Sequence, residues 1–308
     1  MELIVLKDKN FLQAKNDLKK KIQQQKEIDN MAKSAYKKEL KNPKSNLSKD
    51  YKKLLSKNLT SNNLLTTKNE NLKNLKFYAW KKISKKRLAK ESPNYKFLVK
   101  EKRIMLQANS DFIIRLHWTF QDLKYCYFVM EYMEGGCLME YKQILGYKEK
   151  DICFIAAEIV LGLEYMHKDM EVAYRDLKPE NILVDREGHV KLSDFGLSEI
   201  FKDKKNMNDL CGTKEYLAPE MIKREAYDFR VDFWQLGCLL YELYFNVTCF
   251  KNNAHILDPK KSDIVIKAVD FPNKISKSFK NIIVKLLHKD VSIICRFRVI
   301  LFFHIEVI

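Results

Sequence analysis

The chain has 308 residues, 46% of them hydrophobic, so it is long enough to bury a sizeable core in one or two domains. Its 57 Lys and Arg exceed its 40 Asp and Glu by a net charge of +17, which excludes acidic-tail and collagen-like classes and favours a basic globular protein. All eight glycines lie from Gly135 onward, so the first 134 residues contain no glycine-rich nucleotide loop.

Residues 1–49 form a lysine-rich extension, and the first 76 residues hold 19 Lys and 8 acidic residues. Apolar residues recur loosely at helical spacing in this region, which predicts one basic amphipathic helix over residues 2–41, closed by Pro43. We interpret it as a solvated basic helix. A tether to nucleic acid or to an anionic membrane is the alternative, which the absence of arginine and the interspersed acidic residues disfavour.

From residue 77 the pattern tightens. Short apolar runs predict strands, and longer periodic segments predict helices. In chain order we expect a strand at 77–80, a helix at 95–107, strands at 113–120 and 126–132, and a largely buried helix at 150–167. A strand-rich part followed by a helix-rich part, joined near residues 134–136, predicts two lobes with a cleft between them.

The clearest chemistry lies in residues 174–181, which read Tyr-Arg-Asp-Leu-Lys-Pro-Glu-Asn. Asp176 can accept a proton from a hydroxyl group, Lys178 can neutralise a moving phosphoryl group, and Asn181 can ligate Mg²⁺. Asp194 opens an Asp-Phe-Gly sequence and supplies a second oxygen ligand. These groups suit a Mg²⁺ ion that bridges nucleotide phosphates.

These motifs resemble those of a eukaryotic protein kinase, with Tyr-Arg-Asp in place of the commoner His-Arg-Asp. The resemblance implies an α+β, bilobal fold with a small β-rich N-lobe and a larger α-helical C-lobe. Lys81 then resembles the lysine that holds the α and β phosphates, and Glu101 resembles its ion-pair partner. Residues 211–220 resemble the end of an activation segment, and the helix around Asp232 resembles the one that anchors the catalytic loop.

The resemblance also implies boundaries. We expect a kinase domain at 50–290, with an N-lobe at 50–130, a hinge at 131–136, a C-lobe at 137–290 and an apolar tail at 291–308.

Lys178 and Thr213 resemble serine/threonine kinases, because the threonine hydroxyl can bridge Asp176 and Lys178. The runs around Glu101, the hinge and Cys211 resemble the AGC group, which includes the cyclic-nucleotide-dependent kinases and the ribosomal S6 kinases. ATP and Mg²⁺ are the implied cofactors, and proteins are the implied substrates. The residues implied around adenine are Ala79, Met130, Glu131, Met133 and Leu183. An implied stacked apolar column contains Met105, Leu116, Tyr174 and Phe195.

The sequence departs from the family pattern at several places. The phosphate-covering loop would fall near residues 55–61, where Ser56, Asn58 and Ser61 stand at the glycine positions, so weak nucleotide binding is expected. Asp209 stands where AGC-group kinases usually carry a phosphorylated threonine. It can pair permanently with Arg175 and make activity independent of loop phosphorylation, or it can be an ordinary solvated aspartate.

Two further departures concern substrate and C-lobe. Glu180 and Glu242 match acidic positions that read basic residues upstream of the phosphoacceptor, whereas Cys137 replaces a third acidic residue. We therefore expect a basic-directed preference. Arg296 is the only candidate arginine partner for Glu220, and it lies two residues later than the family pattern implies.

Taken from the sequence alone, the favoured function is a serine/threonine protein kinase, and the alternative is a pseudokinase scaffold without efficient ATP turnover. Seven cysteines, an odd number without metal-site spacing, favour reduced thiols in an intracellular, cytoplasmic protein. No secretory signal or transmembrane segment is expected.

Overall fold

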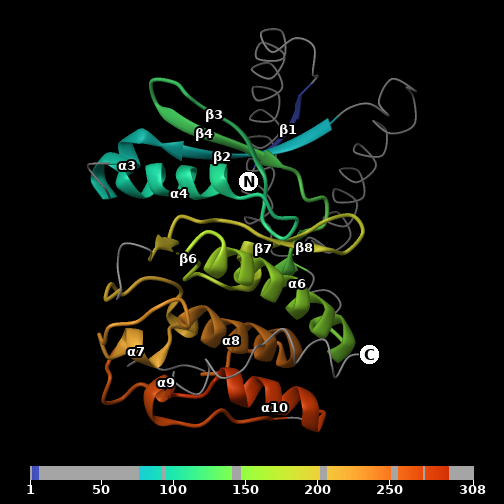
Figure 1. Cartoon of the computed structure of the whole chain (residues 1–308), viewed down its shortest axis with the longest axis vertical. Helices are drawn as coiled ribbons and strands as arrows, with labels where there is room; N and C mark the ends of the chain where they lie inside the picture. The colour runs from blue at the N-terminus through green and yellow to red at the C-terminus, as the bar shows by residue number, and fades with distance from the viewer. Residues whose placement is uncertain are drawn as a thin grey trace, which may run out of the picture. The chain divides into compact units, whose positions relative to one another are not determined.

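The computed structural model describes residues 2–6, 76–91, 95–140, 147–201, 207–250, 256–272 and 275–290 (Figure 1). The chain divides into two compact units, Met1–Lys81 and Lys82–Ile308. In the first unit, β1 (Glu2–Leu6) pairs antiparallel with β2 (Lys76–Ser84), from Glu2 opposite Trp80 to Leu6 opposite Lys76.

The helix expected over residues 2–41 is therefore wrong at its start. The first residues include Ile4 and Val5, whose branched side chains favour extended backbone. Their pairing partner lies some seventy residues further along the chain, where local periodicity does not reach. The rest of the expected helix and the lysine clusters lie outside the described residues.

In the second unit, β3 (Leu116–Gln121) and β4 (Tyr125–Glu131) form an antiparallel hairpin. The Asp122 carboxylate fixes its turn by accepting the backbone N–H groups of Lys124 and Tyr125, both at 2.7 Å. The predicted strand at 113–120 begins too early. Ile113 instead forms an isolated parallel bridge with Leu192.

The helices follow the predicted apolar spacing. The two expected at 95–107 and 150–167 are confirmed as α4 (Lys96–Gln107) and α6 (Glu149–Lys168). Acidic residues in the first turn of α6 and basic residues in its last turn suit the helix dipole. The other helices are α3 (Lys85–Glu91), α7 (Pro219–Ile222), α8 (Val231–Phe245), α9 (Asp263–Ile266) and α10 (Lys277–Leu286).

Two small sheets complete the second unit. In the first, β5 (Gly136–Cys137), β7 (Ile182–Val184) and β8 (Val190–Leu192) lie in that order. In the second, β6 (Val172–Ala173) pairs with β9 (Glu199–Ile200). The loop between β6 and β7 carries the residues singled out for chemistry.

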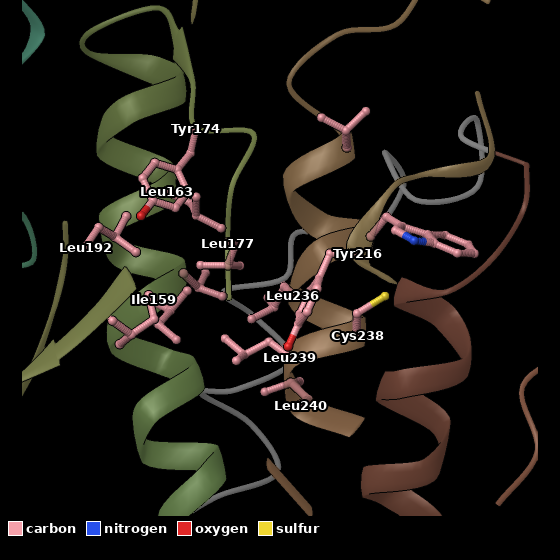
Figure 2. Packing of buried hydrophobic residues seen from close by; sticks show 14 of the residues in the cluster. Ile159, Leu163, Tyr174, Leu177, Leu192, Tyr216, Leu236, Cys238, Leu239 and Leu240 are labelled. Carbon is pink, nitrogen blue, oxygen red and sulfur yellow. The ribbon is translucent and has the colours of Figure 1, made fainter. Parts of the chain in front are cut away.

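The main core lies around this loop. Figure 2 shows Tyr174 and Leu177 among apolar side chains of α6 and α8, including Leu163 and Leu236. All four side chains are 0% exposed. Two apolar residues of the loop are thus built into the core, and they fix the backbone that carries Asp176 between them.

Among the described residues, no helix is long and apolar enough to cross a bilayer. The six cysteines that these residues include are all free thiols, and Cys295 lies outside them. The domain boundaries stay a prediction, because residues 7–49 of the extension expected at 1–49 and the tail at 291–308 also lie outside the described residues.

Candidate active site

Side chains of α8 hold the loop that carries Asp176 through hydrogen bonds to its backbone. The backbone N–H groups of Tyr174 and Arg175 donate to the Asp232 carboxylate at 2.8 and 2.7 Å. His167 Nε2 lies 2.7 Å from the same carboxylate, which is completely buried. Hydrogen bonds to an ionised acceptor are about twice as strong as neutral ones. The expectation that this helix anchors the loop is confirmed.

Gln235, one turn further along α8, holds the same loop by its amide. Its Oε1 accepts the backbone N–H of Leu177 at 2.9 Å, and its Nε2 donates to the carbonyl of Arg175 at 3.0 Å. Gly212 packs against that carbonyl: a β carbon here would stand 2.9 Å from the oxygen, and its φ is +106°. Only glycine meets both conditions without strain.

Asp176 lies at the centre of a cluster of polar side chains. Its carboxylate accepts hydrogen bonds from Asn181 Nδ2 at 2.8 Å and from the Thr213 hydroxyl at 3.0 Å. Lys178 Nζ lies 2.9 Å from the carboxylate and donates to the Thr213 hydroxyl at 2.9 Å. The structure thus brings together the expected aspartate, lysine, asparagine and threonine, although Thr213 is 37 residues away from Asp176.

The hairpin of β7 and β8 brings Asn181 next to Asp194. Ile182 pairs with Leu192, so the residues just outside the two strands also face each other. Ser193 donates to the Asn181 carbonyl from its backbone N–H and from its hydroxyl, each at 2.9 Å. Asp194, with φ of +56°, is the next residue.

Oxygen atoms of Asn181 and Asp194 suit Mg²⁺, which often takes one or two protein ligands and completes its shell with phosphates and water. The side-chain Nδ2 of Asn181 donates to Asp176, so the side-chain oxygen Oδ1 of Asn181 is the atom that a cation would meet. Among the described residues, no group of three or more His, Cys, Asp or Glu side chains could hold a metal ion.

The pKa of the Tyr174 phenol depends on the acidic side chains around it. Its hydroxyl donates to the Ser193 carbonyl. Burial raises the pKa of Tyr174 well above its usual value, and the negative charges of Asp194, Asp176 and Asp232 raise this pKa further. The phenol consequently stays neutral, and the two acidic groups assigned to chemistry share its surroundings.

Glu101 lies against the Asp-Phe-Gly segment. Its Oε2 stands 3.8 Å from where a β carbon of Gly196 would be, and the residue is only 4% exposed. Lys81 lies on β2 in the first unit. The expected ion pair between Lys81 and Glu101 stays a prediction.

The activation segment is tied to the loop by an ion pair. Arg175 Nη1 donates to both carboxylate oxygens of Asp209, at 2.8 and 2.9 Å. The Tyr227 hydroxyl accepts from Arg175 at 3.0 Å and donates to the Asp209 carbonyl at 2.6 Å. Arg175 also lies 3.4 Å from Glu199. The sequence motifs predict the contact between Arg175 and Asp209. They do not predict the contacts of Arg175 with Tyr227 and Glu199, because neither of these residues belongs to a motif.

The comparison with known families decides what this arrangement is. The protein kinase domain family matches residues 65–293. The chain belongs to this family. The expected α+β kinase fold, with a β-strand N-lobe and a helical C-lobe, is confirmed with it.

Curated relatives place the kinase domain in a group. It is 38% identical over 226 residues to Serine/threonine-protein kinase Sgk1-A of Xenopus laevis, covering 70% of this chain and 49% of the relative. It is 40% identical over 191 residues to the cAMP-dependent protein kinase catalytic subunit PRKX of Homo sapiens, covering 62% of this chain and 52% of the relative. Both are AGC-group kinases, so the predicted resemblance to this group is confirmed. The chain spans about half the length of these relatives.

The side chains expected around adenine are mostly buried in the kinase domain. Ala79 lies in the first unit, and Met130, Met133 and Leu183 lie in the second, all below 10% exposed. Glu131 donates its backbone N–H to the Arg115 carbonyl at 2.9 Å, so its own carbonyl is the group it could offer to adenine. The glycine-free segment at 55–61 lies outside the described residues.

The two acidic residues assigned to substrate lie around Tyr216. The Tyr216 hydroxyl donates to Glu242, which is buried, whereas Glu180 is exposed. Burial raises the pKa of Tyr216 most, and the charges of Glu242 and Glu180 add to the rise.

Glu220, at the end of the activation segment, is buried, and burial raises the pKa of its carboxyl group. Among the described residues no Lys, Arg or His lies within ion-pair distance of Glu220, and the expected partner Arg296 lies outside them.

Proposed function

We propose that this chain is a serine/threonine protein kinase that transfers the γ-phosphoryl group of ATP to hydroxyl groups of protein substrates. The observation that carries the proposal is the cluster of Asp176, Lys178, Asn181 and Thr213, whose polar atoms lie within 3.0 Å of one another in a chain of contacts. The names of the relatives, which include serine/threonine-protein kinases, support the same activity.

The roles follow from the chemistry of each group. The Asp176 carboxylate accepts the proton of the attacking serine or threonine hydroxyl, and Thr213 and Asn181 hold that carboxylate in one orientation. Lys178 adds a positive charge where the transferred phosphoryl group becomes more negative. Asn181 and Asp194 would hold Mg²⁺, which supplies charge neutralisation to the ATP phosphates. Lys81, paired with Glu101, would hold the α and β phosphates.

A pseudokinase scaffold is the alternative. It is favoured by the segment without glycine at 55–61, which suggests weak nucleotide binding. Against it stands the fact that Asp176, Asn181 and Asp194 are all present and that the first two are hydrogen-bonded to each other. The relatives' names give the scaffold no support.

The substrate preference is a finer part of the proposal. Glu180 and Glu242 place two negative charges around Tyr216, which suits a peptide with basic residues upstream of the phosphoacceptor. Cys137 replaces an acidic residue at the third position, so the most distant basic residue should matter less. A peptide array tests this directly, and a preference for acidic residues upstream would overturn it.

Phosphate transfer is tested with purified protein, radiolabelled ATP, Mg²⁺ and a basic serine peptide. The decisive variant is Asp194→Asn, which removes a metal ligand. Asp111→Asn is its matched control, because Asp111 is an exposed aspartate of the same unit. Incorporation that persists in the control and disappears in Asp194→Asn supports the kinase. If the unsubstituted protein incorporates no phosphate and ATP gives no thermal shift, the scaffold is favoured instead.

The intracellular, cytoplasmic location is part of the same proposal and rests on the odd number of cysteines in the sequence. The tether between the lysine-rich extension and nucleic acid or anionic lipid stays the disfavoured alternative.

A further inference from the structure

An ion pair joins helix α4 to the segment that follows Asp-Phe-Gly. Lys100 Nζ, on α4, lies 2.6 Å from Glu199 Oε2, on β9. The two side chains are only 18% and 16% exposed, so water screens the pair less than it screens an ordinary surface pair. Lys100 begins the run that resembles the glutamate-bearing helix of the family, but no motif pairs it with Glu199.

The Glu199 end of this pair is held by backbone contacts. Glu199 pairs with Ala173 in the small sheet of β6 and β9. Just before it, the Ser198 hydroxyl donates to the Tyr174 carbonyl at 3.2 Å, and Arg175 Nε donates to the Leu197 carbonyl at 2.8 Å. The Glu199 carboxylate is therefore fixed relative to the catalytic loop.

Glu199 also completes a row of alternating charges. Its carboxylate lies between Lys100 and Arg175, and Arg175 in turn binds Asp209. The Arg175 side chain is only 1% exposed. A buried guanidinium group needs nearby negative charge to offset its lost hydration. Two carboxylates supply that charge here, and none of the four groups requires a phosphate.

The Lys100 end matters because, within the part of the chain that the structure describes, the amino-terminal part of α4 has few other contacts. Phe97 and Val99 are 52% and 63% exposed, and Glu101 is the first buried residue of the helix. The N-cap residue, Tyr95, makes no side-chain cap, and the first turn has no acidic residue. Leu98 and the ion pair of Lys100 thus hold this end of α4, directly before Glu101.

We infer that Lys100 and Glu199 are positioning residues, which hold α4 and its Glu101 in the arrangement required for phosphate transfer without a phosphate on the activation segment. Lys100 acts through its neighbour Glu101, which lies against Gly196. Glu199 acts through Arg175. The inference rests on the proposed kinase activity, but its structural part does not depend on turnover.

The test compares Lys100→Ala, Glu199→Gln, the double variant and Lys100→Arg, all treated with phosphatase. Lys102→Ala is the matched control, since it removes the same charge from an exposed position of the same helix. Each single variant should lower kcat by roughly fivefold, as expected for a partly buried ion pair, with KM for the peptide unchanged. The double variant should be no worse than either single variant, and Lys100→Arg should retain kcat.

Hydrogen exchange of the α4 amides gives the second measurement, which requires no turnover. Exchange should become roughly fivefold faster in Lys100→Ala and Glu199→Gln and stay unchanged in Lys102→Ala. If the unsubstituted protein transfers no phosphate, the proposed function is refuted, and hydrogen exchange alone decides whether the ion pair holds α4. If the α4 amides of Lys100→Ala exchange as slowly as those of Lys102→Ala, the positioning role is wrong. If exchange becomes faster but kcat does not fall, the ion pair holds α4 without serving catalysis, and the inference is overturned as well.

Discussion

Asp209 carries about one negative charge, whereas a phosphothreonine at its position would carry nearly two. Its carboxylate nevertheless makes two hydrogen bonds to Arg175. We expect Asp209→Ala to lower kcat of phosphatase-treated protein by roughly fivefold, since the buried guanidinium loses one of its two negative partners. Asp111→Ala, at an exposed site, should keep kcat. Unchanged activity in Asp209→Ala would mean that the ion pair with Arg175 does not contribute to phosphate transfer.

The pH dependence of stability separates the ion pair from a packing effect. Burial acts to raise the pKa of Asp209, but the charge and hydrogen bonds of Arg175 outweigh it, and the pKa lies below its ordinary value of 3.8. A group with a lowered pKa contributes stability above its unfolded pKa and loses it as the pH falls through its folded pKa. In urea unfolding, Asp209→Asn should therefore be less stable near neutral pH, and the gap should shrink below pH 3.8. A gap that widens in acid would contradict the ion pair.

Among elements, the contact between α8 and α10 depends on one small residue. A β carbon on Gly237 would stand 2.8 Å from Cδ2 and Cγ of Leu287, which directly follows α10. Gly237→Ala gains about 1 kcal/mol in helix propensity but overpacks the contact, at a cost of about 1–3 kcal/mol. We expect a net fall in the free energy of unfolding, measured in urea.

The double variant Gly237→Ala with Leu287→Ala is the control for this contact. Removing the Leu287 side chain makes room for the new methyl group, so the two changes should cost less together than their sum. Strict additivity would mean that the close approach of α8 and α10 does not limit the packing.

Elements whose pattern is local were predictable, and those with distant partners were less so. Apolar periodicity located α4 and α6 to within one residue at each end. It misplaced the start of β3, because Ile113 lies in an isolated bridge opposite Leu192, whose hydrogen bonds run to Phe112 and Ile114, and does not extend the hairpin. It missed β1, whose partner β2 is far along the chain.

The same difference divides the site. Motifs identified Asp176, Lys178 and Asn181, since their spacing within one loop is itself the signal. No sequence spacing indicates the pair of Lys100 and Glu199. The two residues are 99 positions apart in the chain and meet only because the fold brings β9 next to α4.

At the scale of the whole molecule, the affinity for ATP should depend on residues 55–61, which contain no glycine. A ligand at 100 times its Kd stabilises the folded state by about 2.7 kcal/mol, and 1 kcal/mol corresponds to roughly 2–4 °C in a domain of this size. We expect a thermal shift with ATP and Mg²⁺ that EDTA largely removes, because Asn181 and Asp194 are both assigned to the metal.

Affinity should then respond to the missing glycines. Replacing Ser56, Asn58 and Ser61 by glycine removes three β carbons from the backbone that would approach the phosphates. We expect the triple variant to reach half of its maximal shift at a lower ATP concentration, while Asp194→Asn requires a higher one. Titration of ATP at constant Mg²⁺ measures both. If the glycine variant binds ATP no more tightly, residues 55–61 are not the phosphate-covering loop, and the expectation of weak nucleotide binding that rests on them is wrong.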